Sequence, residues 1–191
     1  MGVRRAVHSS KTDLSLGIGP SCMMHSIQKK TVQGECMAGI VEGKLKDMGL
    51  KVPEAASPKV AKILNWKRSG DLLFVSGQVP RVNGEISWIG KVGREFSLEQ
   101  GQEAARDSAV MVLACIKDAV GDLDRVKEIV RIKGYINVDP DFTDISACLN
   151  GASELLIELY GDPGRHSRTA IGVASMPFGV AIEVEGVFEV D

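Results

Sequence analysis

The sequence contains no apolar run that approaches the roughly 18 residues of a membrane-spanning helix. It also lacks a basic surplus: the net charge is -2, so composition gives no sign of nucleic-acid binding. The four cysteines form no C-x-x-C pair, and the three histidines are not spaced as partner metal ligands. We interpret the cysteines as reduced thiols of an intracellular protein and not as a disulfide framework. Cys115 and Cys148 lie in helical patterns and are expected to act as small apolar side chains.

The 191 residues suit one domain, or one domain with an appendage. The first 36 residues carry five basic and two acidic side chains, a net of +3, which leaves -5 for the remainder. We interpret residues 1–36 as a poorly structured extension and Met37 as the functional start. A transit-like segment and a disordered arm are the alternatives. The expected compartment is the cytoplasm, or the mitochondrion if the extension is a transit peptide.

The pattern of the chain predicts an α+β domain. A short amphipathic helix and a linker are expected over residues 37–57, with Ile40, Leu45 and Met48 as its apolar positions. The later elements are expected in the order strand, strand, helix, strand, helix, strand, strand, over residues 72–80, 81–86, 97–121, 128–139, 141–161, 168–175 and 180–190. Ser97 and Gln100 form a capping-box pattern, Gly121 marks the end of that helix, and Asn83–Gly84 marks a tight turn.

The strand at 128–139 alternates in polarity. We expect Val130, Ile132, Ile136 and Val138 on one face and Arg131, Lys133, Tyr135 and Asn137 on the other. In the last strand the apolar face consists of Ile182, Val184, Phe188 and Val190, and the glutamates lie opposite. Two amphipathic helices can cover only one face of the sheet, so we expect the other face to be open to water or packed on a second copy.

The stretch GRHSRTAIGVASMP, residues 164–177, concentrates cationic and hydroxyl side chains at the start of a strand. Arg168 can act as a permanent cation for a carboxylate ligand; the alternative is a cross-strand ion pair with a glutamate of the next strand, which stabilises a fold only slightly. Arg165 is the competing cation. His166 titrates near neutrality, but it has no nucleophile or acidic orienter close in sequence, so we interpret it as an ordinary loop histidine.

Three segments and their order resemble the RidA/YjgF family. They are VSGQVP (75–80), YINVDPDF (135–142) and SRTAIGVASMPFGVAIEVE (167–185), and the resemblance spans about residues 58–190. It implies a chorismate-mutase-like fold with a mixed sheet and two helices on one face, and a homotrimer with sites between subunits. It also implies hydrolysis of reactive 2-imino and 2-enamino acids, such as 2-aminoacrylate, to 2-oxo acids and ammonia, without metal or organic cofactor.

The resemblance assigns roles to six residues. Arg168 matches the arginine that holds the substrate carboxylate, and Glu183 matches the carboxylate that positions the attacking water. The positions that match substrate-binding residues are Ser76 and Gly77 in the pocket wall, Asn150 on a helix facing the cleft, and the backbone of Ala170. The alignment at Asn150 needs a gap of about four residues.

The chain also departs from the family. A tyrosine that covers the pocket in relatives falls on Ile63 here, with Trp66 nearby as a substitute. Residues 161–167 differ from the usual Pro-Ala before the arginine, so the chain resembles a divergent branch. Two alternative functions therefore remain at this point: a protein that binds small carboxylates without turnover, and an endoribonuclease or translation inhibitor, as members of the family were once called.

Overall fold

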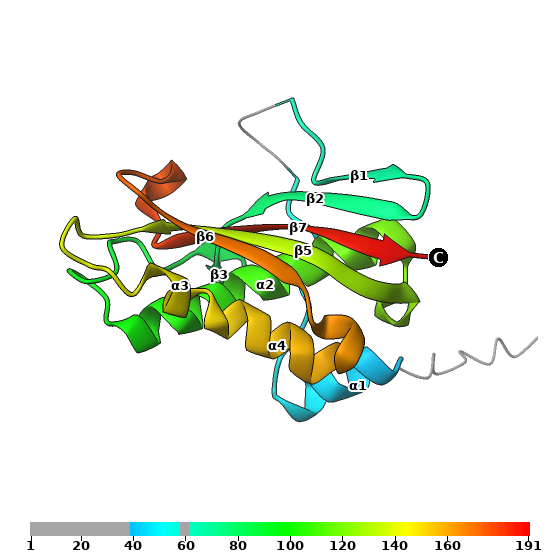
Figure 1. Cartoon of the computed structure of the whole chain (residues 1–191). Coiled ribbons are helices and arrows are strands. Elements are labelled where there is room, and N and C mark those ends of the chain that lie inside the picture. Colours follow the sequence, from blue (N-terminus) through cyan, green and yellow to red (C-terminus); the bar gives the residue numbers. More distant parts are fainter. Residues whose placement is uncertain (1–38, 58–61) are drawn as a thin grey trace, which may run out of the picture. The chain divides into compact units, whose positions relative to one another are not determined.

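The computed structural model describes residues 39–57 and 62–191 (Figure 1). The interpretation of residues 1–36 as an extension lies outside this range. A mixed sheet of five strands has the order β1-β2-β7-β5-β6, in which β5 and β6 run parallel and the other pairs antiparallel. The strands are β1 Trp66–Ser69, β2 Leu72–Gln78, β5 Val126–Asn137, β6 Ser167–Val173 and β7 Ile182–Val190. The predicted α+β class is confirmed.

The helices are α1 Ile40–Asp47, α2 Leu98–Val120, α3 Ile145–Cys148 and α4 Asn150–Tyr160, with short 3-10 turns η1 Leu123–Arg125, η2 Asp162–Gly164 and η3 Pro177–Gly179. Figure 1 shows α1, α2 and α4 on the same side of the sheet. The single strand expected over 81–86 is wrong: a small separate hairpin, β3 Arg81–Val82 and β4 Glu85–Ile86, lies there. Its turn at Asn83–Gly84, with both residues at positive φ, is the tight turn that the sequence predicts. None of the helices in the described ranges has the length and apolarity to cross a membrane.

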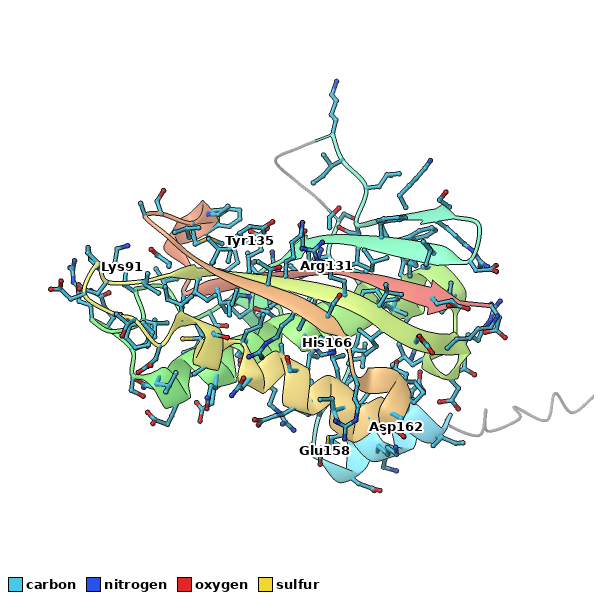
Figure 2. The ribbon with its side chains drawn as sticks, in the orientation of Figure 1. Lys91, Arg131, Tyr135, Glu158, Asp162 and His166 are labelled. Atoms are coloured by element: carbon cyan, nitrogen blue, oxygen red, sulfur yellow. The ribbon has the colours of Figure 1, made fainter. Side chains whose placement is uncertain are left out.

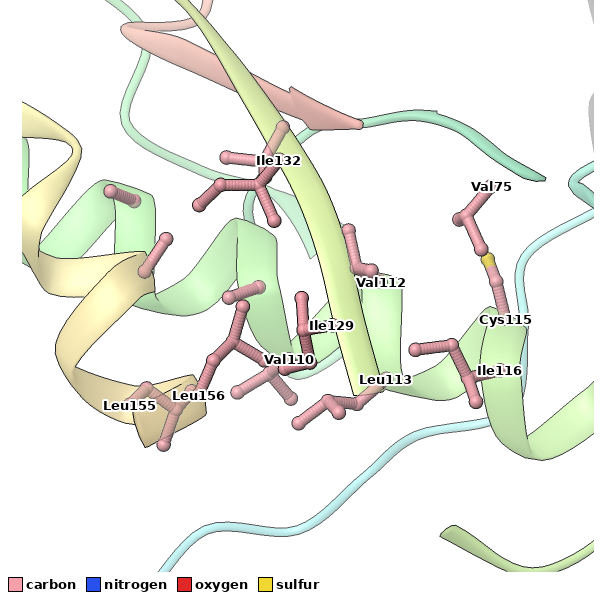
Figure 3. Close-up of a cluster of buried hydrophobic side chains, with 14 of the residues drawn as sticks. Val75, Val110, Val112, Leu113, Cys115, Ile116, Ile129, Ile132, Leu155 and Leu156 are labelled. Atoms are coloured by element: carbon pink, nitrogen blue, oxygen red, sulfur yellow. The ribbon is translucent and has the colours of Figure 1, made fainter. Parts of the chain in front are cut away.

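The long helix α2 begins and ends where the sequence predicts. The Ser97 hydroxyl accepts a hydrogen bond from the Gln100 backbone N–H at 3.3 Å, and the Gln100 side chain accepts one from the Ser97 N–H at 3.0 Å. Gly121 ends the helix at φ 81°. The buried side of α2 packs with β5 and α4 into one core, part of which Figure 3 shows around Val112, Ile116 and Ile132. Cys115 and Cys148 are both free and fully buried, as predicted.

The predicted helix over 141–161 is wrong in its start and its continuity. The chain first makes a turn, in which the Phe142 N–H donates to the Asp139 carbonyl. Helical structure begins at Ile145 and is interrupted at Leu149, which separates α3 from α4. The leucines that recur at helical spacing in this segment are still buried, because Leu149, Leu156 and Leu159 all lie in the core.

The predicted alternation of β5 fails at both ends. A register shift against β7 between Ile129 and Arg131 buries Ile129 and leaves Val130 40% exposed. One extra residue in a strand reverses the alternation on one side of it, and sequence periodicity does not show this. Asn137, predicted on the polar face, is buried and accepts a hydrogen bond from Lys91 Nζ at 2.6 Å. In α1, Val41 and Leu45 are buried, whereas Ile40 is exposed.

Among the described residues, no helix covers the face of the sheet opposite α1, α2 and α4. Buried and half-buried residues alternate along the whole of β7, with its glutamates on the uncovered face as predicted. Three apolar side chains of that face are exposed: Leu72 and Phe74 on β2, and Ile171 on β6. Charged side chains lie among them, such as Lys133 and Glu185, whose side chains pair at 2.8 Å. We refer to this surface as the open sheet face.

Candidate functional site

Arg168 lies near the start of the edge strand β6 and is directed to the helix side of the sheet. Its register partner on β5 is Ile132, which is fully buried under the helices. Nη1 donates to Asn150 Oδ1 at 2.9 Å and to Ser153 Oγ at 3.1 Å. Nη2 donates to the Ser146 carbonyl and hydroxyl oxygens, both at 3.2 Å. The structure therefore brings together Arg168 and Asn150, two of the predicted site residues, and holds the guanidinium against α3 and α4.

No carboxylate in the described part of the chain compensates the charge of Arg168. All of its acceptors are neutral, and within residues 39–57 and 62–191 it forms no ion pair with Asp or Glu. The alternative of a cross-strand pair with a β7 glutamate is thus wrong, because β5 separates β6 from β7. The competing cation, Arg165, pairs with Asp162 at 3.2 Å on the surface. Arg168 is therefore a fixed cation with capacity for an anion.

His166 is not the isolated loop histidine that the sequence indicates. Its Nε2 lies 3.0 Å from Ser153 Oγ on α4, and its Nδ1 lies 2.6 Å from the Gly164 carbonyl oxygen. Figure 2 shows His166 where β6 begins beside the helix layer. Burial lowers the pKa of His166, the bond to the Gly164 carbonyl opposes this, and nearby Arg168 lowers the pKa further. The ring is therefore neutral at pH 7.

The polar residues that support Arg168 were not all foreseen. Ser146 and Ser153 were missed, although Ser146, Asn150 and Ser153 recur at the i, i+4, i+7 spacing of one helix face. That stripe of hydroxyl and amide groups is the signal that could have identified them. The stripe continues from α3 into α4, because only Leu149 separates the two helices in the sequence.

Glu183 lies on the open sheet face, over Gly77. A Cβ atom at Gly77 would fall 1.8 Å from Glu183 Oε1, so only glycine leaves room for this carboxylate. Burial raises the pKa of Glu183, and the negative charge of Glu185 raises it further. The adjacent Ser76 uses its hydroxyl to donate to the Leu64 carbonyl at 2.8 Å. The structure thus groups Ser76, Gly77 and Glu183 on the same face of the sheet.

A hollow of about 410 Å³ adjoins this group. Its lining is Ile63, Leu64, Trp66, Lys67, Phe74, Val75, Ser76 and Glu185. Ile63, the residue in the place of the family tyrosine, lies beside Ser76 in this lining and is 58% exposed. The Trp66 indole instead donates to Asp118 of α2 at 2.8 Å, which ties it to the helix side. Trp66 therefore lines the hollow with its indole N–H held by α2.

The predicted site residues form two groups on opposite faces of the sheet. Arg168 and Asn150 lie on the helix side, where Ala170, two residues along β6, shares the face of Arg168. Glu183, Ser76 and Gly77 lie on the open sheet face. Strands β6 and β7 flank β5, so their backbones are about 10 Å apart, two strand spacings. One protomer therefore does not place the Arg168 guanidinium and the Glu183 carboxylate around one small substrate.

Among the described residues, neither the thiols nor the possible metal ligands form a further centre. Burial raises the pKa of Cys148 to about 11 and that of Cys115 to about 12, so both stay protonated at neutral pH. In the part of the chain that the structure describes, no three His, Cys, Asp or Glu side chains gather as metal ligands.

Known proteins share this fold and much of this sequence. Residues 42–188 match the protein family described as "YjgF/chorismate mutase-like, putative endoribonuclease". Protein TCP17 of Trypanosoma cruzi is 39% identical over 155 residues, 81% of this chain and 96% of that protein.

Two crystal structures are also similar. A protein of unknown function from Agrobacterium tumefaciens is 38% identical with a TM-score of 0.75, over 80% of this chain and 93% of its own. A protein from Shewanella oneidensis called a "putative endoribonuclease" is 32% identical with a TM-score of 0.76, over 78% of this chain and 99% of its own. With residues 42–188 matched throughout and the fold shared, the chain belongs to the YjgF/RidA family.

Proposed function

We propose that the protein is a deaminase that hydrolyses 2-imino and 2-enamino acids to 2-oxo acids and ammonia without a cofactor. The observation that carries this proposal is Arg168, a cation held by four neutral acceptors and paired with no carboxylate in the described residues. Its Nε–H donates to no acceptor there, so it is available to a ligand. A fixed guanidinium suits a substrate that carries a carboxylate beside the reacting carbon.

We propose further that the active form is a homotrimer. Arg168 and Glu183 lie on opposite faces of one sheet, so a complete site needs the Arg168 group of one copy and the Glu183 group of another. The open sheet face supports this arrangement, since it exposes Leu72, Phe74 and Ile171 in the protomer. An interface over that face would bring the Glu183 group on the central strand β7 against a neighbouring copy.

Glu183 is the proposed proton-transfer group. The pKa of Glu183 is raised and is therefore closer to neutral pH than that of a free carboxyl group. This suits a group that both accepts and returns a proton. Glu183 takes a proton from water as the water oxygen bonds to C2 of the protonated imine. The proton then passes to the nitrogen of the tetrahedral intermediate, the C–N bond breaks, and ammonia leaves with the electron pair. The remaining C2 hydroxyl loses its proton, giving the 2-oxo acid, so that one water is consumed for each ammonia released.

The test is the formation of 2-oxo acid from 2-iminobutyrate or 2-aminoacrylate generated in the assay. We expect the wild type to be active and Arg168→Ala to lose at least about 100-fold in kcat/KM, because the carboxylate is no longer positioned. The matched control is Arg165→Ala, which removes a neighbouring arginine whose charge is already paired with Asp162 and should retain activity. Equal activity of Arg168→Ala and the wild type would contradict the proposal.

A carboxylate-binding protein without turnover is the second candidate, favoured by Ile63 in the place of the family tyrosine. It predicts that pyruvate raises the thermal stability of the wild type and not of Arg168→Ala, with no ammonia released. The name of the Shewanella relative raises ribonuclease activity as a further assay. RNA cleavage that depends on Arg168 would count against the deaminase, whereas cleavage that persists in Arg168→Ala would indicate contamination.

A further inference from the structure

A chain of hydrogen bonds leads from the loop before β6 to the Arg168 guanidinium. The His166 ring contacts the Gly164 carbonyl through Nδ1 and Ser153 Oγ through Nε2, and Ser153 Oγ also accepts from Arg168 Nη1. The three side chains come from β6, α4 and the residue before β6. Ser153 lies in the middle and is 8% exposed.

The contacts determine the direction of each bond. A carbonyl oxygen only accepts, so His166 Nδ1 carries the hydrogen and donates to Gly164. Because the ring is neutral, Nε2 has a lone pair and accepts from the Ser153 hydroxyl. The hydroxyl hydrogen is thereby directed away from Arg168, and an oxygen lone pair is left for the Arg168 N–H. A donor at Nε2 would instead occupy one lone pair of the Ser153 oxygen and leave the hydroxyl hydrogen without an acceptor at this position.

The neutral state of His166 follows from its surroundings. The ring is half-buried beside Arg168, the charged group that faces it, while α4 contributes the Ser153 hydroxyl and η2 the Gly164 carbonyl. Burial lowers the pKa of His166 and the Arg168 charge lowers it further. A neutral acceptor is thus maintained at pH 7.

We propose that His166, acting through Ser153, is a positioning residue that orients the Arg168 guanidinium for the substrate carboxylate. The inference rests on the proposed function of Arg168 and adds a requirement for this chain: an acceptor at the Nε2 position. Without it, the Ser153 side chain can change its χ1 rotamer and donate to a carbonyl of its own helix, as serines in helices do. Its oxygen then moves away from Arg168 Nη1, which depends on Asn150 alone.

Two substitutions separate this role from simple packing of the loop. His166→Gln retains a carbonyl oxygen near the Nε2 position, and so retains the acceptor for Ser153. His166→Asn retains a donor near the Nδ1 position, and so retains the bond to Gly164. Each variant keeps one of the two ring contacts, so we expect similar falls in Tm. If the relay to Arg168 matters, Gln preserves substrate affinity and Asn does not.

The experiment measures KM and kcat for 2-iminobutyrate and the Kd of pyruvate by calorimetry. For His166→Asn and Ser153→Ala we expect KM and Kd to rise about threefold to tenfold, with kcat changed less than about twofold. His166→Gln should remain within about twofold of the wild type. The double variant His166→Asn/Ser153→Ala should be no weaker than either single variant, because both remove the same relay.

Other outcomes overturn the proposal. If Asn preserves affinity and Gln does not, His166 acts through Gly164 and the loop. If the effects of the Asn and Ala substitutions add, His166 and Ser153 act separately. If the wild type binds pyruvate but shows no turnover, the deaminase proposal is wrong. The role of His166 and Ser153 is then still tested by the Kd values of the variants. A wild type that neither binds nor turns over removes the role of Arg168, and both proposals fall together.

Discussion

At the scale of the residue, Gly77 is a position where adding one methyl group should reduce activity without destabilising the fold. A Cβ atom there would lie 1.8 Å from Glu183 Oε1 and 2.6 Å from its carboxyl carbon. Those atoms are the end of a flexible side chain, so Gly77→Ala should displace Glu183 and leave the sheet intact. We expect kcat in the imine assay to fall at least about tenfold, with unfolding free energy changed by less than about 1 kcal/mol. Gly43→Ala, where nothing lies within 4 Å, is the control for activity. A fully active Gly77→Ala would argue against catalysis by Glu183.

The residue scale also shows what the sequence can predict about the site. Arg168, Asn150 and Gly77 are visible in linear motifs, and the structure places Arg168 beside Asn150 and Gly77 beside Glu183. The role of Ser153 is not visible in this way. Its contact with His166 spans 13 residues and depends on how α4 packs against the start of β6. Such contacts arise from tertiary packing, and no local pattern encodes them.

At the scale of the element, α2 is the part of the fold whose ends are determined locally. Both hydrogen bonds of its capping box are present, so Ser97→Ala should lower the free energy of unfolding by about 1 kcal/mol. Urea denaturation monitored by circular dichroism measures this change, and Ser97→Asp, which keeps an acceptor at the cap, should retain most of the stability. A loss in Ser97→Asp as large as that in Ser97→Ala would mean that the hydroxyl is needed for something other than the cap.

Elements whose course depends on a partner strand are predicted less well. The sequence of β5 alternates, yet its pairing with β7 shifts register between Ile129 and Arg131 and moves Val130 out of the core. The start of α3 is delayed by the turn after Pro140, in which Asp139 accepts hydrogen bonds from the next residues. Local preferences thus identified the main helices and most strands, although not β1 (Trp66–Ser69), and neighbours in space determined the bounds and the bulge.

At the scale of the whole molecule, the two groups of site residues lie on opposite faces of one sheet, and this has a consequence for mixtures of inactive variants. Arg168→Ala and Glu183→Gln should each be inactive alone. Hybrid trimers, formed by unfolding and refolding an equal mixture, would contain sites with Arg168 from one copy and Glu183 from another. Half of the copies supply an intact Arg168 and the other half an intact Glu183. With random mixing, about a quarter of the sites should therefore contain both side chains and be active. The assay is 2-oxo acid formation by the refolded mixture.

The control for this mixture is Arg168→Ala refolded with the double variant Arg168→Ala/Glu183→Gln. No copy in that mixture supplies Arg168, so no site can form and activity should stay at the background. Recovery in the first mixture alone would place the two side chains of one site on different copies. Failure of the first mixture to recover, with light scattering showing that hybrid trimers have formed, would mean that each site takes both side chains from the same copy. The opposite placement of Arg168 and Glu183 about β5 predicts recovery, because within one copy the sheet itself lies between the cation and the carboxylate.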